Sequence, residues 1–115
     1  MFKFEELNVY QEALKFANEV YRITQEWPRQ EMFGLIDQLR RASVSVALNI
    51  AEGTSRTKKD FGHFLDLSRG SCFECVAVLT IARDQNYINT LIYEKLYSSC
   101  VSLSRMLSAL KNSLS

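Results

Sequence analysis

The chain has 115 residues and a mass of 13.3 kDa, which is enough for one domain. Its 14 basic and 13 acidic residues nearly cancel, which excludes a protein that coats nucleic acid through bulk positive charge. One proline and four glycines are too few for the turns of a β-sandwich or barrel. No apolar run approaches the roughly 18 residues of a membrane span, and the first residues lack the apolar centre of a signal peptide. We therefore expect a helical, cytoplasmic protein that does not enter a membrane.

Turn signals divide the chain into four segments with helical periodicity. Pro28 ends the first segment, because the residue before a proline is disfavoured in a helix. Gly53 is expected at the C-terminus of the second helix, where a left-handed residue is common. Thr57 and Asn89 are expected to cap the third and fourth helices. Within a single domain spanning 1–115, helices are predicted at about 5–26, 31–52, 57–84 and 89–113.

Apolar spacing supports this division and predicts which faces are buried. The last segment places apolar residues at alternating steps of three and four: Tyr93, Leu96, Cys100, Leu103, Leu107, Leu110 and Leu114. In the first segment, the expected core face contains Ala13, Ala17 and Val20, and further apolar residues recur every seven positions beside it: Val9, Phe16 and Ile23. Four such helices joined by short loops predict an all-α, antiparallel up-and-down four-helix bundle.

The second segment is apolar on two sides. One wide face, which includes Leu39, Val46 and Ile50, is sufficient for the bundle core. A second strip lies on the other side of the helix and consists of Phe33, Val44, Leu48 and Ala51. Because a four-helix monomer buries only one face of each helix, this strip indicates a homo-oligomer interface. The alternative is that its members are scattered exposed apolar residues, which are common.

A line of polar residues runs between the two apolar sides of the second segment: Gln38, Arg41, Ser45, Asn49 and Glu52. Arg69, Ser71 and Glu74 of the third segment are expected to complete a structural polar network with them. The alternative is a ligand or nucleic-acid contact. Gly70 indicates a close approach of a neighbouring helix, so Gly70→Leu is expected to break the packing by overfilling it.

Residues that could carry catalysis are few. Cys72 and Cys75 have the spacing of a metal or redox pair, but only Cys100 and His63 remain as further zinc ligands and lie far away in sequence. We therefore interpret the cysteines as small core residues in a reducing compartment. The Glu-x-x-His spacing of di-iron bundles and glycine-rich phosphate loops are both absent. The sequence predicts no catalytic residue, no metal, no cofactor and no enzymatic activity.

Five basic residues near the ends of the second segment are candidates for nucleic-acid binding: Arg40, Arg41, Arg56, Lys58 and Lys59. The first 28 residues carry three basic and five acidic groups, a net charge of −2, so the rest of the chain carries +3. Basic groups in one loop can hold phosphates, and repetition around an oligomer multiplies the effect. A solvated turn is the alternative.

The run from Gln38 to Gly53, QLRRASVSVALNIAEG, resembles the signature of the bacterial four helix bundle family, also called the 23S rRNA intervening sequence proteins. The resemblance covers nearly the whole chain and includes Leu7-x-Val9-Tyr10-x-x-Ala13, Arg69-Gly70-Ser71-x-x-Glu74 and Tyr87-Ile88. It implies an up-and-down four-helix bundle that assembles into a homopentameric ring and associates with RNA or another nucleic acid. It implies no catalytic residue.

The chain is also distantly similar to accessory proteins of diversity-generating retroelements, which are more strongly basic pentamers thought to bind nucleic acid and a reverse transcriptase. A protein–protein interaction scaffold without nucleic-acid binding is the alternative function, because the net charge of +1 is nearly neutral.

Overall fold

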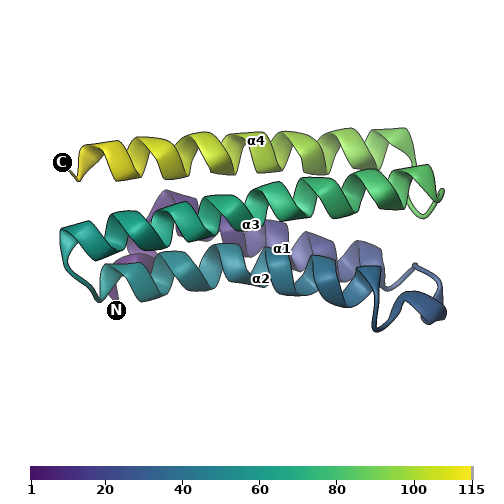
Figure 1. The fold of residues 1–115 in the computed structure, drawn as a ribbon, viewed down its shortest axis with the longest axis horizontal. Helices are drawn as coiled ribbons and strands as arrows, with labels where there is room; N and C mark the ends of the chain where they lie inside the picture. The colour runs from purple at the N-terminus through teal and green to yellow at the C-terminus, as the bar shows by residue number, and fades with distance from the viewer. Residues whose placement is uncertain (115) are drawn as a thin grey trace.

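The structure is a computed structural model and describes residues 1–114. These residues form four long α-helices and two short 3₁₀ helices, and no strand occurs among them (Figure 1). In chain order the elements are η1 (Lys3–Glu6), α1 (Asn8–Thr24), η2 (Arg29–Glu31), α2 (Leu35–Thr54), α3 (Lys58–Asp84) and α4 (Thr90–Ser113).

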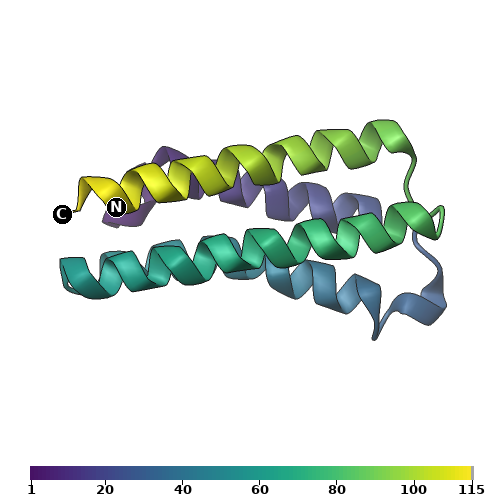
Figure 2. The same cartoon turned by 45° about the horizontal axis from the view of Figure 1, so that its top comes forward.

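The four helices lie along one long axis, and the described residues extend over 43 × 22 × 21 Å. Figures 1 and 2 show the chain passing back and forth: the N-terminus and the last turn of α4 lie at the end that holds the α2–α3 turn, and η2 lies at the other end with the α3–α4 turn. Each helix contacts the one before it, and α1 also contacts α4. Among these helix pairs, α2 and α3 make the most extensive contact, and α1 and α4 make the least extensive contact.

Side-chain caps fix where α3 and α4 begin, as the sequence predicts. The hydroxyl oxygen of Thr57 accepts a hydrogen bond from the backbone N–H of Asp60, with 3.3 Å between oxygen and nitrogen. The side-chain oxygen of Asn89 accepts from the N–H of Ile92 at 2.8 Å. Asn86, in the turn between these helices, adopts a left-handed backbone with φ of 65°.

The first two helices are shorter than expected at their N-termini. Leu7 has an extended backbone that separates η1 from α1, so α1 begins at Asn8 rather than near residue 5. The non-helical dihedral angles of Gly34 likewise delay α2 to Leu35, so Phe33 lies before this helix and not on it.

The position of Gly53 was predicted wrongly. The residue lies inside α2, is buried, and has no positive φ. A Cβ at this position would lie 2.6 Å from Cδ1 of Phe61 and 2.9 Å from Cβ of Phe64. Glycine is therefore required here because α3 passes very close to the end of α2, and not because the backbone is left-handed.

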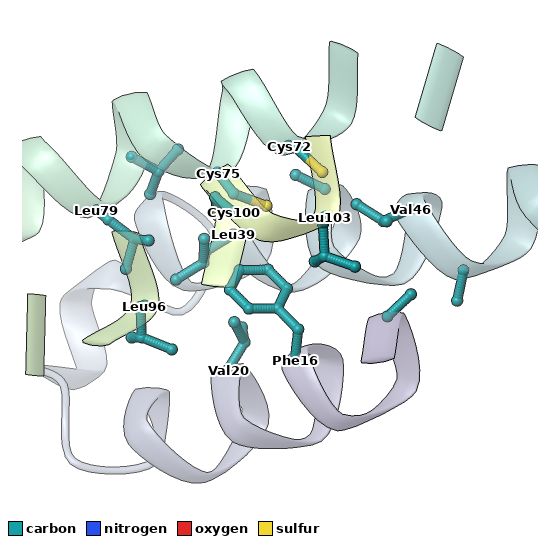
Figure 3. Close-up of a cluster of buried hydrophobic side chains, with 14 of the residues drawn as sticks. Phe16, Val20, Leu39, Val46, Cys72, Cys75, Leu79, Leu96, Cys100 and Leu103 are labelled. Carbon is teal, nitrogen blue, oxygen red and sulfur yellow. The ribbon is translucent and has the colours of Figure 1, made fainter. Parts of the chain in front are cut away.

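All four helices contribute to one hydrophobic core, which Figure 3 shows in close-up. The predicted buried face of α4 is confirmed, since Leu96, Cys100, Leu103 and Leu107 are at most 2% exposed. The face of α1 is rotated relative to the prediction, because Val9, Phe16 and Ile23 are also core residues. They therefore provide no extra outward apolar surface.

The described helices are all either too short or too polar to cross a membrane.

Candidate interaction surfaces

The second apolar strip of α2 faces away from the core. Leu39, Val46 and Ile50 on the opposite face are fully buried, whereas Leu48 is 61% exposed. Val44 and Ala51 are half-buried. Phe33, which precedes the helix, is 96% exposed. The four residues thus form an outward surface, here called the α2 strip (Phe33, Val44, Leu48 and Ala51), that the chain itself covers only in part.

Two hollows continue the α2 strip at its two ends. Near the α2–α3 turn, Leu48 and Ala51 line a hollow of about 710 Å³ together with the aromatic rings of Phe2 and Phe4. Near the start of α2, Phe33 and Val44 line a second hollow of about 350 Å³, whose other walls include Tyr21, Met32, Ile36, Asp37, Arg40 and Arg41. Both hollows offer space that another protein surface can fill.

Part of the expected polar network is present between α2 and α3. The side-chain amide of Asn49 donates to the hydroxyl of Ser45, and the hydroxyl of Ser71 donates to the same oxygen, each over 2.9 Å. The amide of Asn49 also donates to the backbone carbonyl of Ser45 at 2.9 Å. These three side chains connect the two helices beside the α2 strip and fix their register.

The charged members of the proposed network do not join these three residues. Arg41 pairs with Asp37 at 3.2 Å, and Glu52 pairs with Arg56 at 2.6 Å, both on the exposed surface. Arg69 places its guanidinium 4.8 Å from the ring centre of Phe73, on the side of α3 that faces α4. The side chains of Gln38 and Glu74 are exposed and make no hydrogen bond or ion pair to any residue from 1 to 114.

The close contact between α2 and α3 is made by a residue that the sequence analysis missed. Ser68 is fully buried, and its hydroxyl donates to the backbone carbonyl of Val46 at 2.7 Å. Gly70, predicted to allow this approach, is exposed and would place a Cβ in open space, with nothing within 4 Å. The predicted effect of Gly70→Leu on intrachain packing is therefore wrong. The place of Ser68 in the sequence could have indicated its role, because this residue lies one helical turn from the buried residues Leu65 and Cys72.

The five basic candidates divide into two groups at opposite ends of α2, and three of them are engaged within the chain. Arg40 donates to the hydroxyl of Thr24 at 2.9 Å and lies 4.7 Å from the ring centre of Tyr21. Arg41 and Arg56 form the ion pairs described above. The remaining two, Lys58 and Lys59, are exposed at the start of α3 and have no carboxylate partner among residues 1–114.

The three cysteines are buried, unpaired core residues, as interpreted from the sequence. Burial raises the pKa of Cys72 to about 11 and that of Cys100 to about 12, and it raises the pKa of Cys75 as well. The thiols are therefore protonated and poorly nucleophilic near neutral pH. No group of three His, Cys, Asp or Glu side chains within residues 1–114 is arranged to hold a metal ion.

Together, these features define an all-α four-helix bundle protein with an outward apolar strip. The 23S rRNA-intervening sequence protein family matches residues 5–109, so the chain belongs to this family. A solved structure from Bacteroides thetaiotaomicron, a protein of unknown function from the S23 ribosomal protein family, shares the fold with a TM-score of 0.83. It is 21% identical, and the match covers 90% of this chain and 95% of the other. No curated protein matches the chain.

Proposed function

We propose that this chain is the subunit of a homo-oligomeric ring, with antiparallel four-helix bundles as its protomers, and that the ring associates with RNA without catalysing a reaction. The observation that carries the assembly is the α2 strip, because Leu48 and Phe33 are large apolar side chains left in water beside a complete core. A second copy of the chain is the simplest cover for such a surface. Five subunits is the number that the family resemblance implies.

The proposed association with RNA rests on the family description and on the uneven distribution of charge along the chain, whose first 28 residues carry −2 and whose remainder carries +3. Lys58 and Lys59 stand free at the α2–α3 turn, and a closed ring repeats this turn once per subunit. Repetition of a weak phosphate contact raises the overall affinity without any new contact within one chain. The protein would act in the cytoplasm of a bacterium, where RNA is available.

Light scattering on the purified 13.3 kDa chain tests the assembly. We expect the wild type to have a mass several times that of one chain, and Leu48→Glu to lower it because a buried charge at the interface is costly. The matched control is Leu91→Glu, since Leu91 is 77% exposed at the start of α4 and lies outside the strip. A wild-type particle of 13.3 kDa, or equal masses for wild type and Leu48→Glu, would contradict the proposed interface.

Fluorescence anisotropy with a labelled structured RNA tests the second part. Binding should be measurable at about 50 mM salt and weaken strongly by about 200 mM, because phosphate contacts release counterions. Absence of binding at the lower salt concentration contradicts RNA association. It would favour the alternative of a protein-interaction scaffold, which the ion pairs of Arg41 and Arg56 and the net charge of +1 support.

A further inference from the structure

A third hollow, separate from the α2 strip, lies between α3 and α4. It has a volume of about 360 Å³ and is here called the α3–α4 groove. Arg69, Phe73 and Val76 of α3 form one wall, and Tyr97, Ser104 and Arg105 of α4 form the other. A neighbouring hollow of about 400 Å³ continues the groove along α4 and shares Tyr97 and Arg105 with it.

The groove is positively charged. Arg69 and Arg105 approach it from opposite walls, and no carboxylate lines this groove or the neighbouring hollow. The guanidinium of Arg69 lies over the ring of Phe73, and the side chains of Arg69 and Arg105 make no hydrogen bond or ion pair to any residue from 1 to 114. Arg41 and Arg56, in contrast, are neutralised by Asp37 and Glu52. The two groove arginines are therefore free to bind an anion.

Aromatic rings alternate with these arginines along the same face. Phe73 is 57% exposed and Tyr97 is 43% exposed, although large aromatic side chains are usually buried. The ring centre of Tyr97 lies 5.8 Å from that of Tyr93, and the guanidinium of Arg83 lies 4.3 Å from the ring centre of Tyr93. From Arg69 to Arg83 the face therefore extends about 21 Å along α3, at 1.5 Å per residue.

Carboxylates near this face compensate Arg83 but do not line the part of the groove that holds Arg69 and Arg105. Asp84 pairs with Arg83 at 3.4 Å, and Asp66 pairs with Lys111 at 2.6 Å. Glu94 lies on α4 one turn before Tyr97 and has no basic partner among the described residues. None of the three lines the groove that contains Arg69 and Arg105.

We infer that the α3–α4 groove binds single-stranded RNA, with bases stacked on Phe73 and Tyr97 and phosphates held by Arg69 and Arg105. Exposed aromatic rings combined with unpaired guanidinium groups are the features by which proteins bind unpaired nucleotides. In a duplex the bases are stacked on one another and cannot reach the rings, so the groove should prefer a single strand. The inference rests on the proposed RNA association, but it places the contact on a different face from Lys58 and Lys59.

Anisotropy titrations with a labelled oligouridine and with an RNA duplex of equal length test the inference. Arg69→Gln/Arg105→Gln should weaken oligouridine binding at least tenfold and make the slope of log K against log salt shallower by about 1.4, which is about 0.7 for each phosphate contact on a single strand. Phe73→Ala/Tyr97→Ala should weaken it at least fivefold with the salt dependence unchanged. The charge-matched control, Lys15→Gln/Arg29→Gln, removes two positive charges that line neither the groove nor the neighbouring hollow, and it should bind as the wild type does. Circular dichroism and light scattering on each variant establish that the fold and the assembly are retained.

Three results would overturn the inference. If the arginine variant binds normally while Lys58→Gln/Lys59→Gln loses binding, the α2–α3 turn is the site, and the proposed function survives without the groove. If the wild type binds neither oligouridine nor the duplex, the inference and the proposed RNA association both fail. If the groove variants lower the mass of the assembly, the groove is a contact between copies of the chain.

Discussion

The phenol of Tyr87 donates a hydrogen bond to the carboxylate of Glu31, with 2.9 Å between Oη and Oε2, although 56 residues separate them. The other carboxylate oxygen, Oε1, accepts from the backbone N–H of Leu35 at 3.2 Å and so supports the first turn of α2. One carboxylate therefore joins the α1–α2 connection, the start of α2 and the α3–α4 turn at the same end of the bundle. The ring of Tyr87 also lies 5.7 Å from that of the buried Trp27.

This hydrogen bond predicts a stability that depends on pH. The bond to Glu31, together with burial, raises the pKa of Tyr87 above its ordinary value near 10. Because the folded-state pKa is the higher one, the stabilisation is complete below pH 10 and is lost as the pH rises through the folded-state value. Urea unfolding at pH 8 should show Tyr87→Phe to be less stable than the wild type, and the difference should shrink above pH 10. A difference that stays constant with pH would contradict the role of the phenolic proton.

Gly53→Ala should destabilise the protein. The new Cβ meets the ring of Phe61, which can turn, and the Cβ of Phe64, which is fixed by the backbone of α3. Overpacking of this kind costs about 1–3 kcal/mol, which exceeds the roughly 1 kcal/mol that alanine gains over glycine within a helix. Urea unfolding monitored by circular dichroism measures the change. A variant more stable than the wild type would show that α3 can move away at no cost.

Gly70→Ala is the matched substitution with the opposite expected sign. Gly70 lies in the middle of α3, and a Cβ there meets nothing within 4 Å. The free energy of unfolding should therefore rise by up to about 1 kcal/mol, the helix-propensity difference between alanine and glycine. Both glycine variants should be compared at one protomer concentration, because assembly contributes to apparent stability. A loss of stability in Gly70→Ala would contradict this prediction and would indicate that another surface packs against α3 at this position.

These two glycines show what the sequence could and could not predict. The caps at Thr57 and Asn89 and the buried face of α4 depend on neighbours within one helix, so local pattern was sufficient for them. The role of a glycine depends on which helix lies opposite, and the sequence pattern does not contain that information. The α3–α4 groove was missed for the same reason, since Arg69 and Arg105 line one groove only because α3 and α4 pack together.

The thiols provide a test of core packing. Because burial raises the pKa of Cys72 to about 11 and that of Cys100 to about 12, thiolates are scarce at pH 8. Ellman's reagent should therefore label none of the three cysteines rapidly in the folded protein, and all three after unfolding in urea. Rapid labelling of one thiol at pH 8 without urea would show that the core opens at that residue. It would also support the alternative that Cys72 and Cys75 form a reactive pair.

The last prediction concerns Arg40, whose charge first suggested a nucleic-acid contact. Its Nε donates to the Thr24 hydroxyl, which is 1% exposed, and its guanidinium lies over the ring of Tyr21, so it connects α2 to α1. Loss of the hydrogen bond and of the cation–π contact in Arg40→Gln should cost about 1–2 kcal/mol.

The neighbouring Arg41→Gln is the control for Arg40→Gln. The ion pair of Arg41 with Asp37 leaves the arginine side chain 76% exposed, so its loss should cost less than about 0.5 kcal/mol. Urea unfolding of the two variants at the same protomer concentration separates the roles. Equal losses of stability would show that the contacts of Arg40 with α1 contribute no more than a surface ion pair. In that case Arg40 would be as free as Lys58 and Lys59 to bind phosphate.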